Sequence, residues 1–334
     1  MKKIKVALIG YGGIARVHNN SYYKLKNEGV PCELVAVCDK DPSRITAKLD
    51  FNLGNDNMPL PDGIHIYSDI DALIEKEDFD VADICLPTFL HKSAAVKLLE
   101  AGKHVICEKP MALSSADCTH MTGAARANDR NLMIAHPIRF DPAYRFLREC
   151  VLDGRFGKLD NIYMDRHSVY PTWGASFADN SITGGATLDT HIHDVDAARF
   201  ILGEPLSVFA TEFIDIPKYQ AVTSTLRFEN TTAIINCSWD SSYTTPFTYG
   251  FRARFEGASV VCKDGVVTVT KCGCEPEKIE LCTADSVTEE IRHFIGIVLS
   301  GEESNINPPE ASLASVRLIE KIRESAALKE CLKL

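Results

Sequence analysis

Short apolar segments alternate with polar, amphipathic segments over roughly the first 135 residues of the chain. The apolar segments are rich in Val and Ile and are bounded by Gly, Pro or Asp. This pattern is typical of strands that are buried on both faces of a parallel sheet. The expected strands cover residues 4–9, 34–38, 64–67, 81–86, 104–107 and 132–135.

The segments between these strands have the pattern of helices. Ser68 to Asp71 has the form of a capping box, residues 93–101 form a helix ended by Gly102, and Ser114 and Ser115 cap a helix that ends near residue 128. The polar stretch 54–63 is expected to be a surface insertion. Regular alternation of strand and helix predicts a doubly wound parallel α/β sheet over residues 1–136.

The pattern changes after residue 136. A helix over 142–152 leads into a strand, and a second helix is expected over 188–202. Serial strands joined by tight turns then predict a large, mainly antiparallel open sheet. These strands cover residues 223–228, 233–239, 260–263 and 266–270, and Asp264-Gly265 gives a hairpin signal between the last two.

Two helices, over 287–299 and 309–328, close the chain. Residues 137–334 are therefore expected to form an α+β domain, whose last helix could pack back on the first domain. The length of 334 residues also favours two domains over one.

Composition narrows the class of partner. A net charge of -10 argues against nucleic-acid binding, because no domain offers a strongly basic face. No stretch of 18 apolar residues exists, so no membrane segment is expected. The apolar segment 4–9 is too short for a signal peptide and is followed by Gly10 rather than by a cleavage site. A cytoplasmic protein with a small-molecule partner fits these features.

Twelve cysteines are present, and most lie singly within apolar segments, where free cysteine behaves as a small hydrophobe. Examples are Cys38, Cys85, Cys107, Cys237 and Cys262. The densest cluster is Cys272-Gly273-Cys274. A structural zinc site would need two paired Cys-x-x-Cys knuckles, so no metal is expected.

The first expected strand leads directly into a G-x-G-x-x-A segment, the pattern of a dinucleotide site between a strand and a helix. This segment is Gly10, Tyr11, Gly12, Gly13, Ile14 and Ala15. Gly10 permits a tight turn, Gly12 lets the backbone approach a diphosphate, and Ala15 lets helix and strand pack closely. The helix that follows would present free N–H groups to the phosphates.

Asp39 follows the second expected strand. A carboxylate at this place can accept hydrogen bonds from the adenosine ribose and would repel a 2′-phosphate, so NAD is favoured over NADP. Arg44 could soften that preference by approaching a phosphate. A helix-capping role is the alternative for Asp39.

Lys109 lies in Glu108-Lys109-Pro110, directly after the fifth expected strand. Ligands of such sheets bind at the carboxyl ends of the strands. The lysine could therefore reach a substrate oxygen beside a nicotinamide. A surface lysine before a turn proline is the alternative.

Asp189 and His193 are four residues apart and are expected to share a helix face. A histidine can take a proton from an alcohol as the hydride leaves, and the aspartate could orient it or hold a substrate hydroxyl. His191, Asp194 and Asp196 should point elsewhere. A metal site is the rival interpretation, but no H-x-x-x-H pair or cysteine lies in register, so none is expected.

Together these segments resemble the glucose–fructose oxidoreductase / inositol dehydrogenase (Gfo/Idh/MocA) family. The resemblance covers nearly the whole chain and is carried by residues 7–15, 86–91, 101–110, 184–196 and 310–325. The Ala-Gly-Lys-His-Val and Glu-Lys-Pro sequences within 101–110 are its specific part, whereas the glycine loop alone is not.

The resemblance implies a Rossmann domain followed by a domain whose open sheet forms the interface of a homodimer or homotetramer. It implies NAD(P)-dependent dehydrogenation of a sugar or polyol, with Lys109, Asp189 and His193 as the catalytic residues and histidine as the acid/base. Residues that it implies around the cofactor are Pro87, Thr88, His91 and Glu108.

His191 departs from the family pattern, because relatives often have glycine there, and its imidazole could narrow or polarise a substrate pocket. Ala186 stands where a third glycine is frequent. Tyr170 and Trp173 could stack on a sugar or simply pack within their loop. The arginines at positions 139 and 166, which could contact an anionic substrate, are expected instead in structural ion pairs.

Three other functions remain open from the sequence. A relative of the same fold could break glycosidic bonds through transient oxidation by bound NAD. A non-catalytic nucleotide or sugar sensor is the second, although Lys109, Asp189 and His193 are all present. A metal-dependent hydrolase that uses the His-Asp cluster is the third.

Overall fold

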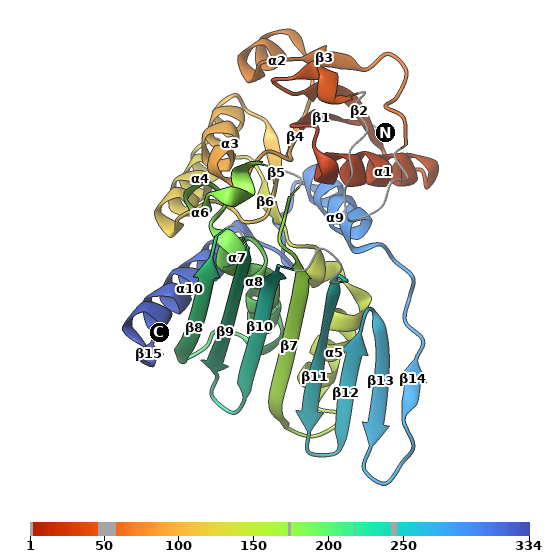
Figure 1. The fold of residues 1–334 in the computed structure, drawn as a ribbon. Helices are drawn as coiled ribbons and strands as arrows, with labels where there is room; N and C mark the ends of the chain where they lie inside the picture. The colour runs from red at the N-terminus through yellow and green to blue at the C-terminus, as the bar shows by residue number, and fades with distance from the viewer. Residues whose placement is uncertain (1–2, 46–57, 173–174, 217, 242–245) are drawn as a thin grey trace. The chain divides into compact units, whose positions relative to one another are not determined.

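The computed structural model describes residues 3–45, 58–172, 175–216, 218–241 and 246–334 (Figure 1). The chain forms two compact units. Unit 1 contains Met1–Pro137 and Asp285–Leu313, and unit 2 contains Ile138–Ala284 and Ala314–Leu334.

Unit 1 is built on a six-stranded parallel sheet with the order β3-β2-β1-β4-β5-β6. The strands are β1 (Ile4–Ile9), β2 (Cys32–Cys38), β3 (His65–Tyr67), β4 (Val81–Ile84), β5 (His104–Glu108) and β6 (Leu132–Ala135). This order is that of a doubly wound sheet, in which ligands bind where the winding direction changes, between β1 and β4. The predicted fold class is confirmed for this part of the chain.

Helices of unit 1 follow the predicted pattern with small shifts. They are α1 (Gly13–Asn27), α2 (Ile70–Lys76), α3 (His91–Glu100), α4 (Ser115–Ala127) and α9 (Ser286–Ser300). Ser114 caps α4 as expected, through a hydrogen bond from the backbone N–H of Asp117. The capping box was placed one residue early, because Asp69 rather than Ser68 caps α2.

The compact units differ from the expected domains in the assignment of residues 285–313, which belong to unit 1. Ile291, Phe294 and Ile295 of α9 are fully buried in one apolar cluster with residues of β1 and α1. The helix that completes unit 1 is therefore α9. The sequence analysis considered the last helix, α10 (Pro309–Leu328), as the one that packs back on the first domain. From Ala314 onward, however, α10 belongs to unit 2.

Unit 2 is built on a nine-stranded sheet with the order β14-β13-β12-β11-β7-β10-β9-β8-β15. The strands are β7 (Leu159–Val169), β8 (Ser207–Asp215), β9 (Tyr219–Arg227), β10 (Thr232–Asp240), β11 (Thr248–Phe255), β12 (Ala258–Lys263), β13 (Val266–Lys271), β14 (Glu277–Ile279) and β15 (Leu332–Lys333). Only β7 and β10 pair in parallel, so the mainly antiparallel sheet is confirmed. Asp264 and Gly265 both have positive φ, as the predicted hairpin turn requires.

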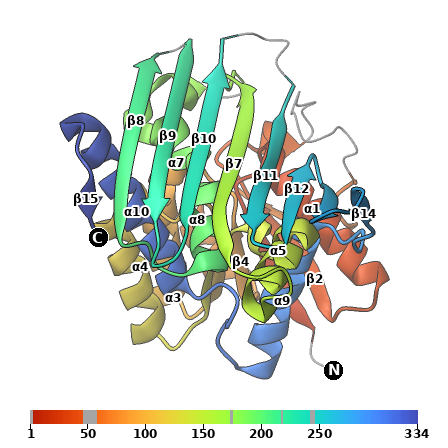
Figure 2. The same cartoon turned by 90° about the horizontal axis from the view of Figure 1, so that it is seen from below.

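One face of this sheet carries helices and the other is open (Figure 2). Helix α5 (Pro142–Asp153), α7 (Gly185–Asp189) and α8 (His191–Leu202) lie on the covered face, where α7 contacts β9 and β10 and α8 contacts β7 and β10. Burial alternates along β7 and along the first half of β8, as expected of strands with one packed face. Tyr163, Phe209 and Phe213 are large apolar side chains exposed on these strands.

Candidate functional site

The glycine loop joins β1 to α1 at the switch point of the parallel sheet. Gly10 has φ +88°, and a Cβ there would lie 2.9 Å from the carbonyl oxygen of Cys85, so both conformation and space favour glycine. A Cβ on Gly12 would meet nothing within 4 Å. Ala15 is fully buried. The loop is closed on the sheet side and open beside Gly12, which suits a backbone that approaches a diphosphate.

The first turn of α1 is available to an anion. Its N-cap Gly12 offers no side chain, and no acidic residue lies in its first turn. Side chains cap α2, α4 and α9, whereas α3, which follows a 3-10 turn, also has no side-chain cap. Uncapped N–H groups and the positive end of the helix dipole favour phosphate binding. This end of α1 therefore fits the diphosphate of a dinucleotide.

Asp39 is buried at the end of β2 and connects two loops. One of its carboxylate oxygens accepts the backbone N–H of Tyr11 at 2.8 Å, and the other accepts the backbone N–H of Asp41 at 2.9 Å. The carboxylate thus holds the glycine loop instead of capping a described helix. Each oxygen has a second lone pair, so acceptance from ribose hydroxyls is still possible. Arg44 is exposed nearby in sequence.

The loops that follow β4 and β5 are tied together by His91. Its Nδ1 lies 2.8 Å from the carbonyl oxygen of Pro110, and its Nε2 lies 2.7 Å from that of Leu86. Burial lowers the pKa of His91 below its ordinary value. In the loop after β4, Pro87 is exposed and Thr88 is buried. The ring of His91 is therefore committed to backbone contacts that shape this edge of the sheet.

Lys109 is the one residue of the segment 105–112 that is not buried. Glu108, the last residue of β5, accepts the Lys109 backbone N–H on Oε2 at 3.1 Å, while its Oε1 lies 3.1 Å from Nε2 of His18. Burial would raise the pKa of Glu108, but the contact with His18, together with the charges of Lys109 and His91, outweighs burial and lowers the pKa. Glu108 is thus an interior carboxylate, and Lys109 at the end of the strand is partly accessible.

In unit 2, Asp189 closes α7 and His193 lies in the first turn of α8. A single helix over 188–202 was expected, but the two helices are separated at Thr190, whose hydroxyl accepts the indole N–H of Trp239 at 2.8 Å. The argument from spacing along one helix therefore does not apply. Between residues 183 and 199, all residues are buried except Asp189 and His193. These two polar side chains are the partly accessible ones in this segment, and Nδ1 of His193 is itself buried.

The neighbouring aspartates, Asp194 and Asp196, form ion pairs with arginines. Asp194 accepts two hydrogen bonds from Arg166, at 2.8 and 3.0 Å, and Asp196 accepts two from Arg139, at 2.7 and 2.8 Å. All four side chains are buried. The prediction that the two arginines form structural ion pairs is confirmed.

His191 is turned into the interior of unit 2. Its side chain is fully buried, with Nε2 2.8 Å from the hydroxyl of Ser224 and with no described hydrogen-bond partner for Nδ1. Burial lowers the pKa of His191 to about 3. The ring is therefore neutral at physiological pH and presents no surface to solvent, unlike the expected pocket-lining histidine.

Tyr170 packs rather than lining an open surface. It is buried, donates its hydroxyl to the carbonyl of Phe177 at 2.8 Å and meets the ring of Trp239 edge-on at a centroid distance of 5.5 Å. These contacts favour the packing interpretation. Trp173 lies outside the described residues.

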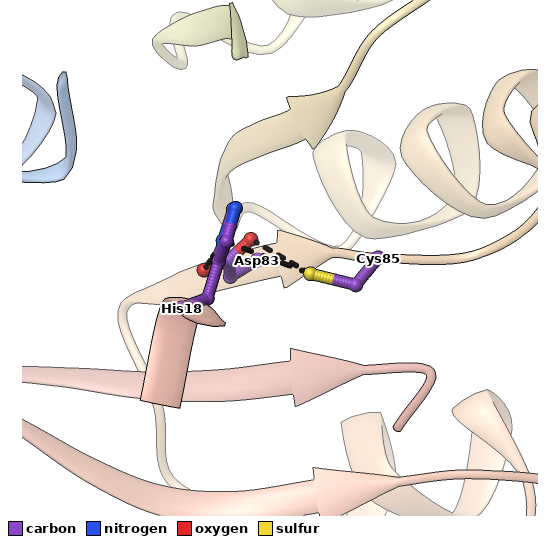
Figure 3. Close-up of side chains that lie close together, drawn as sticks. All are labelled: His18, Asp83 and Cys85. Carbon is purple, nitrogen blue, oxygen red and sulfur yellow. Dashed lines mark hydrogen bonds and ion pairs between the residues drawn. The ribbon is translucent and has the colours of Figure 1, made fainter. Parts of the chain in front are cut away.

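The Cys272-Cys274 pair is exposed and free, whereas the five cysteines expected in apolar segments are buried. Among the described residues, the cluster with three potential metal-ligating side chains lies elsewhere, at His18, Asp83 and Cys85 (Figure 3). The sequence analysis did not single out this cluster, because its members belong to separate elements.

A doubly wound parallel sheet with a glycine loop at its switch point defines a Rossmann-type dinucleotide-binding protein. Residues 4–136 match the family model described as oxidoreductase family, NAD-binding Rossmann fold, and residues 144–267 match that of the GFO/IDH/MocA C-terminal domain. The chain belongs to the Gfo/Idh/MocA family of oxidoreductases and is an enzyme of that family.

Relatives with assigned activities are similar over much of the chain. It is 29% identical to inositol 2-dehydrogenase of Rhizobium meliloti over 296 residues, which cover 87% of this chain and 82% of that one. It is 34% identical to D-glucoside 3-dehydrogenase of Escherichia coli over 208 residues, 60% of this chain and 55% of the other. A structure of levoglucosan dehydrogenase with NADH and L-sorbose has the same fold, with a TM-score of 0.85 at 19% identity, and the match covers 100% of this chain and 99% of that one.

No described helix combines the length and the hydrophobicity that crossing a bilayer requires.

Proposed function

We propose that the protein is an NAD-dependent dehydrogenase that oxidises a hydroxyl-bearing carbon of a sugar, polyol or related small molecule, or reduces the corresponding carbonyl. The observation that carries this proposal is the partial accessibility of Lys109, Asp189 and His193, each within an otherwise buried segment. Polar side chains that stay partly accessible where their neighbours are buried can contact a ligand. These three also match the catalytic residues of the family.

The roles follow from the chemistry of alcohol oxidation. His193 takes the hydroxyl proton as the C–H bond breaks. Lys109 donates a hydrogen bond to the same oxygen and stabilises the charge that develops there. Asp189 orients His193 or accepts a second substrate hydroxyl. Bound NAD supplies the acceptor for the hydride at its nicotinamide ring. In the reverse direction His193 returns the proton to the carbonyl oxygen.

The cofactor is proposed to bind along the edge of the parallel sheet in unit 1. The uncapped end of α1 receives the diphosphate, and Asp39 accepts the ribose hydroxyls. A 2′-phosphate would meet the Asp39 carboxylate, so NAD is preferred over NADP. The proposed cofactor-binding residues are Gly10, Tyr11, Gly12, Gly13, Ile14, Ala15, Asp39, Pro87, Thr88, His91, Glu108 and Lys109.

The open face of the unit 2 sheet is proposed to form the interface of a homodimer or homotetramer. Exposed Tyr163, Phe209 and Phe213 give this face an apolar character that favours burial against a second copy. A cytoplasmic location is proposed because the free cysteines fit a reducing compartment. Sedimentation of the purified protein tests the assembly, and a monomer at micromolar concentration would contradict it.

The test of the activity is an absorbance assay of cofactor reduction with purified protein, NAD or NADP, and a panel of polyols, aldoses and sugar acids. We expect one substrate class to reduce NAD, with NADP at least about tenfold poorer, which corresponds to about 1.4 kcal/mol. Lys109→Ala and His193→Ala should each lower kcat by about 10²- to 10⁴-fold, and NAD binding should persist in His193→Ala. Lys76→Ala and His120→Ala, at exposed positions, are the matched controls.

Tight NAD binding without reduction by any substrate would contradict the dehydrogenase. Glycoside cleavage with no net NADH would instead support the glycosidase-like reaction, and the absence of both reactions would support a sensor. Stoichiometric zinc in the active protein would support a metal-dependent hydrolase.

A further inference from the structure

A cluster of ionisable side chains lies in the interior of unit 1 and contains none of the residues to which catalysis was assigned. His18 of α1 has Nδ1 2.8 Å from Oδ2 of Asp83 on β4 and Nε2 3.1 Å from Oε1 of Glu108 on β5. The side chains of His18 and Asp83, which lie against each other in Figure 3, are completely buried. Tyr22 donates its hydroxyl to the same Asp83 oxygen at 2.9 Å.

Both ring nitrogens of His18 face carboxylate oxygens. A neutral imidazole has one N–H and can donate to only one of them, whereas an imidazolium donates to both. Burial disfavours the charged ring, but Asp83 and Cys85 together outweigh burial and raise the pKa of His18 well above its ordinary value. His18 is thus a buried cation between two carboxylate groups. In this geometry the imidazolium and the carboxylates supply each other's hydrogen-bond partners.

Cys85 gives this cluster the residue types of a metal site, since its Sγ lies 3.6 Å from both His18 Nδ1 and Asp83 Oδ1. A metal would require a free lone pair on Nδ1 and a thiolate. Nδ1 instead faces Asp83 at hydrogen-bonding distance, and burial raises the pKa of the Cys85 thiol to about 12. The distances therefore favour a hydrogen-bonded ion network.

This network continues to the residue proposed to act on the substrate. Glu108 uses one carboxylate oxygen for His18 and the other for the backbone N–H of Lys109, at 3.1 Å. Lys109 is the residue at which the buried strand end becomes accessible. Any movement of the Glu108 carboxylate therefore moves the backbone from which the lysine side chain extends.

We propose that His18 is a positioning residue: as a buried imidazolium it fixes the Glu108 carboxylate, and through Glu108 it fixes the backbone of Lys109. The proposal rests on the proposed catalytic role of Lys109. It assigns no substrate or cofactor contact to His18, whose side chain is completely buried. Its effect on catalysis passes through Glu108 alone.

The consequence of removing the charge follows from burial. Without His18, Glu108 is an interior carboxylate that has lost its cationic partner, and it must take up a proton or move. Either change weakens its bond to the Lys109 amide. A displacement of about 1 Å at a catalytic group can lower the rate by about 10²-fold. We therefore expect His18→Gln to lower kcat by about 10- to 100-fold while the KM values change far less.

The decisive measurement combines kinetics with the NMR signal of the Lys109 amide in full-length protein labelled with ¹⁵N-lysine. His18→Gln, Glu108→Gln and the double variant form a cycle. We expect His18→Gln to abolish the hydrogen-exchange protection of the Lys109 amide. In the Glu108→Gln background the same substitution should have less than about a twofold further effect on kcat. Lys109→Arg identifies the Lys109 signal.

His65→Gln is the matched control, because His65 also pairs with a carboxylate, Glu77 at 2.6 Å, but at the surface. It should leave kcat and the Lys109 amide unchanged. Asp83→Asn provides a second variant if His18→Gln does not fold, because it retains the ring but removes one of the two carboxylates that hold it. It should reduce the Lys109 amide protection in the same direction.

A folded His18→Gln protein with normal Lys109 protection and normal kcat would overturn the proposal, as would additive effects in the cycle or stoichiometric zinc bound at the cluster. The amide measurement needs no turnover. Loss of Lys109 protection in a protein without dehydrogenase activity would therefore support the role of His18 in positioning while contradicting the proposed function.

Discussion

Acidification should destabilise unit 2 through His191. This ring is fully buried, Nδ1 has no described partner, and burial lowers the pKa to about 3. In the unfolded chain the same histidine has an ordinary pKa of about 6.5. The folded state therefore keeps the ring neutral over a range in which the unfolded state binds a proton.

The sign and size follow from proton linkage. Between about pH 6.5 and pH 3 the unfolded state binds one more proton at this site, so stability falls as the pH falls. The slope is about 1.4 kcal/mol per pH unit. From pH 7 to pH 5 the loss amounts to about 2 kcal/mol, and this figure does not depend on the exact folded pKa as long as that value lies well below 5. Above pH 7 the site contributes almost no pH dependence.

The assay is urea unfolding followed by the fluorescence of Trp239, whose indole contacts Thr190 beside His191. The chain has two tryptophans, so a Trp173→Phe background makes Trp239 the single reporter. Other groups also titrate over this range, and the informative quantity is the difference between variants. His191→Gln should reduce the stability loss between pH 7 and pH 5 by about 2 kcal/mol.

His120→Gln is the control, since His120 is exposed, and it should unfold with the pH dependence of its parent. Replacing a buried ring can change stability at every pH, and this offset does not enter the comparison. An unchanged pH dependence in His191→Gln would refute the reasoning, because it would mean that His191 binds its proton equally well in both states.

Three further predictions test other buried groups. Both carboxyl oxygens of Glu290 lack a described partner, and burial raises the pKa of Glu290 well above the ordinary value. Glu290→Gln should therefore stabilise unit 1 above about pH 4.5, and the increase in the urea midpoint should grow toward neutral pH. Arg139→Met removes two hydrogen bonds from buried Asp196, which retains a 3.9 Å ion pair with Arg199, and should cost about 3 kcal/mol in Trp239-detected unfolding, part of which Asp196→Asn should recover. Gly10→Ala places a Cβ 2.9 Å from the Cys85 carbonyl oxygen in a backbone of positive φ and should cost about 1–3 kcal/mol of stability. Calorimetry should show NAD binding weakened by about tenfold or more, and an unchanged affinity would contradict the proposed role of this loop in NAD binding.

The strands of the parallel sheet were predictable because burial on both faces leaves continuous apolar segments in the sequence. In unit 2 the prediction succeeded where turn residues mark a hairpin, as at Asp264-Gly265, and failed for β8 and β11. β8 has Phe209 and Phe213 on the open face, so its two faces differ little in polarity and the alternation that marks a half-buried strand is weak.

Helix α9 shows a second limit of sequence analysis. Its apolar stripe was recognised, and the helix occurs where it was expected. An apolar stripe indicates that a helix packs, but it does not identify the surface that it covers. Only the tertiary structure shows that Phe294 and Ile295 complete the core of unit 1, because strands β7 to β14 of unit 2 lie between them and the Met1–Pro137 part of unit 1 in the sequence.

The candidate site shows the same limit at the level of single residues. His191 and His193 are the same residue type two positions apart in the first turn of α8, where this spacing points them to different sides, so one is buried and the other partly accessible. The i, i+4 spacing selected Asp189 and His193, although no continuous helix joins them. Their accessibility depends on how α7 and α8 pack on the sheet, and no local spacing rule contains that information.

The contacts of His18 could not be predicted from a sequence motif, because they depend on the tertiary structure. Its partners lie 65 and 90 residues away and meet it only because β4 and β5 are neighbours beneath α1. A local pattern cannot encode such a contact. The constraint on these positions is the pairing of polar groups in the interior: the imidazolium ring lies within hydrogen-bonding distance of both an aspartate and a glutamate. The effects of substitutions at the three positions should therefore be coupled. A neutral replacement of His18 should destabilise the protein least when Asp83 or Glu108 is replaced by its amide as well.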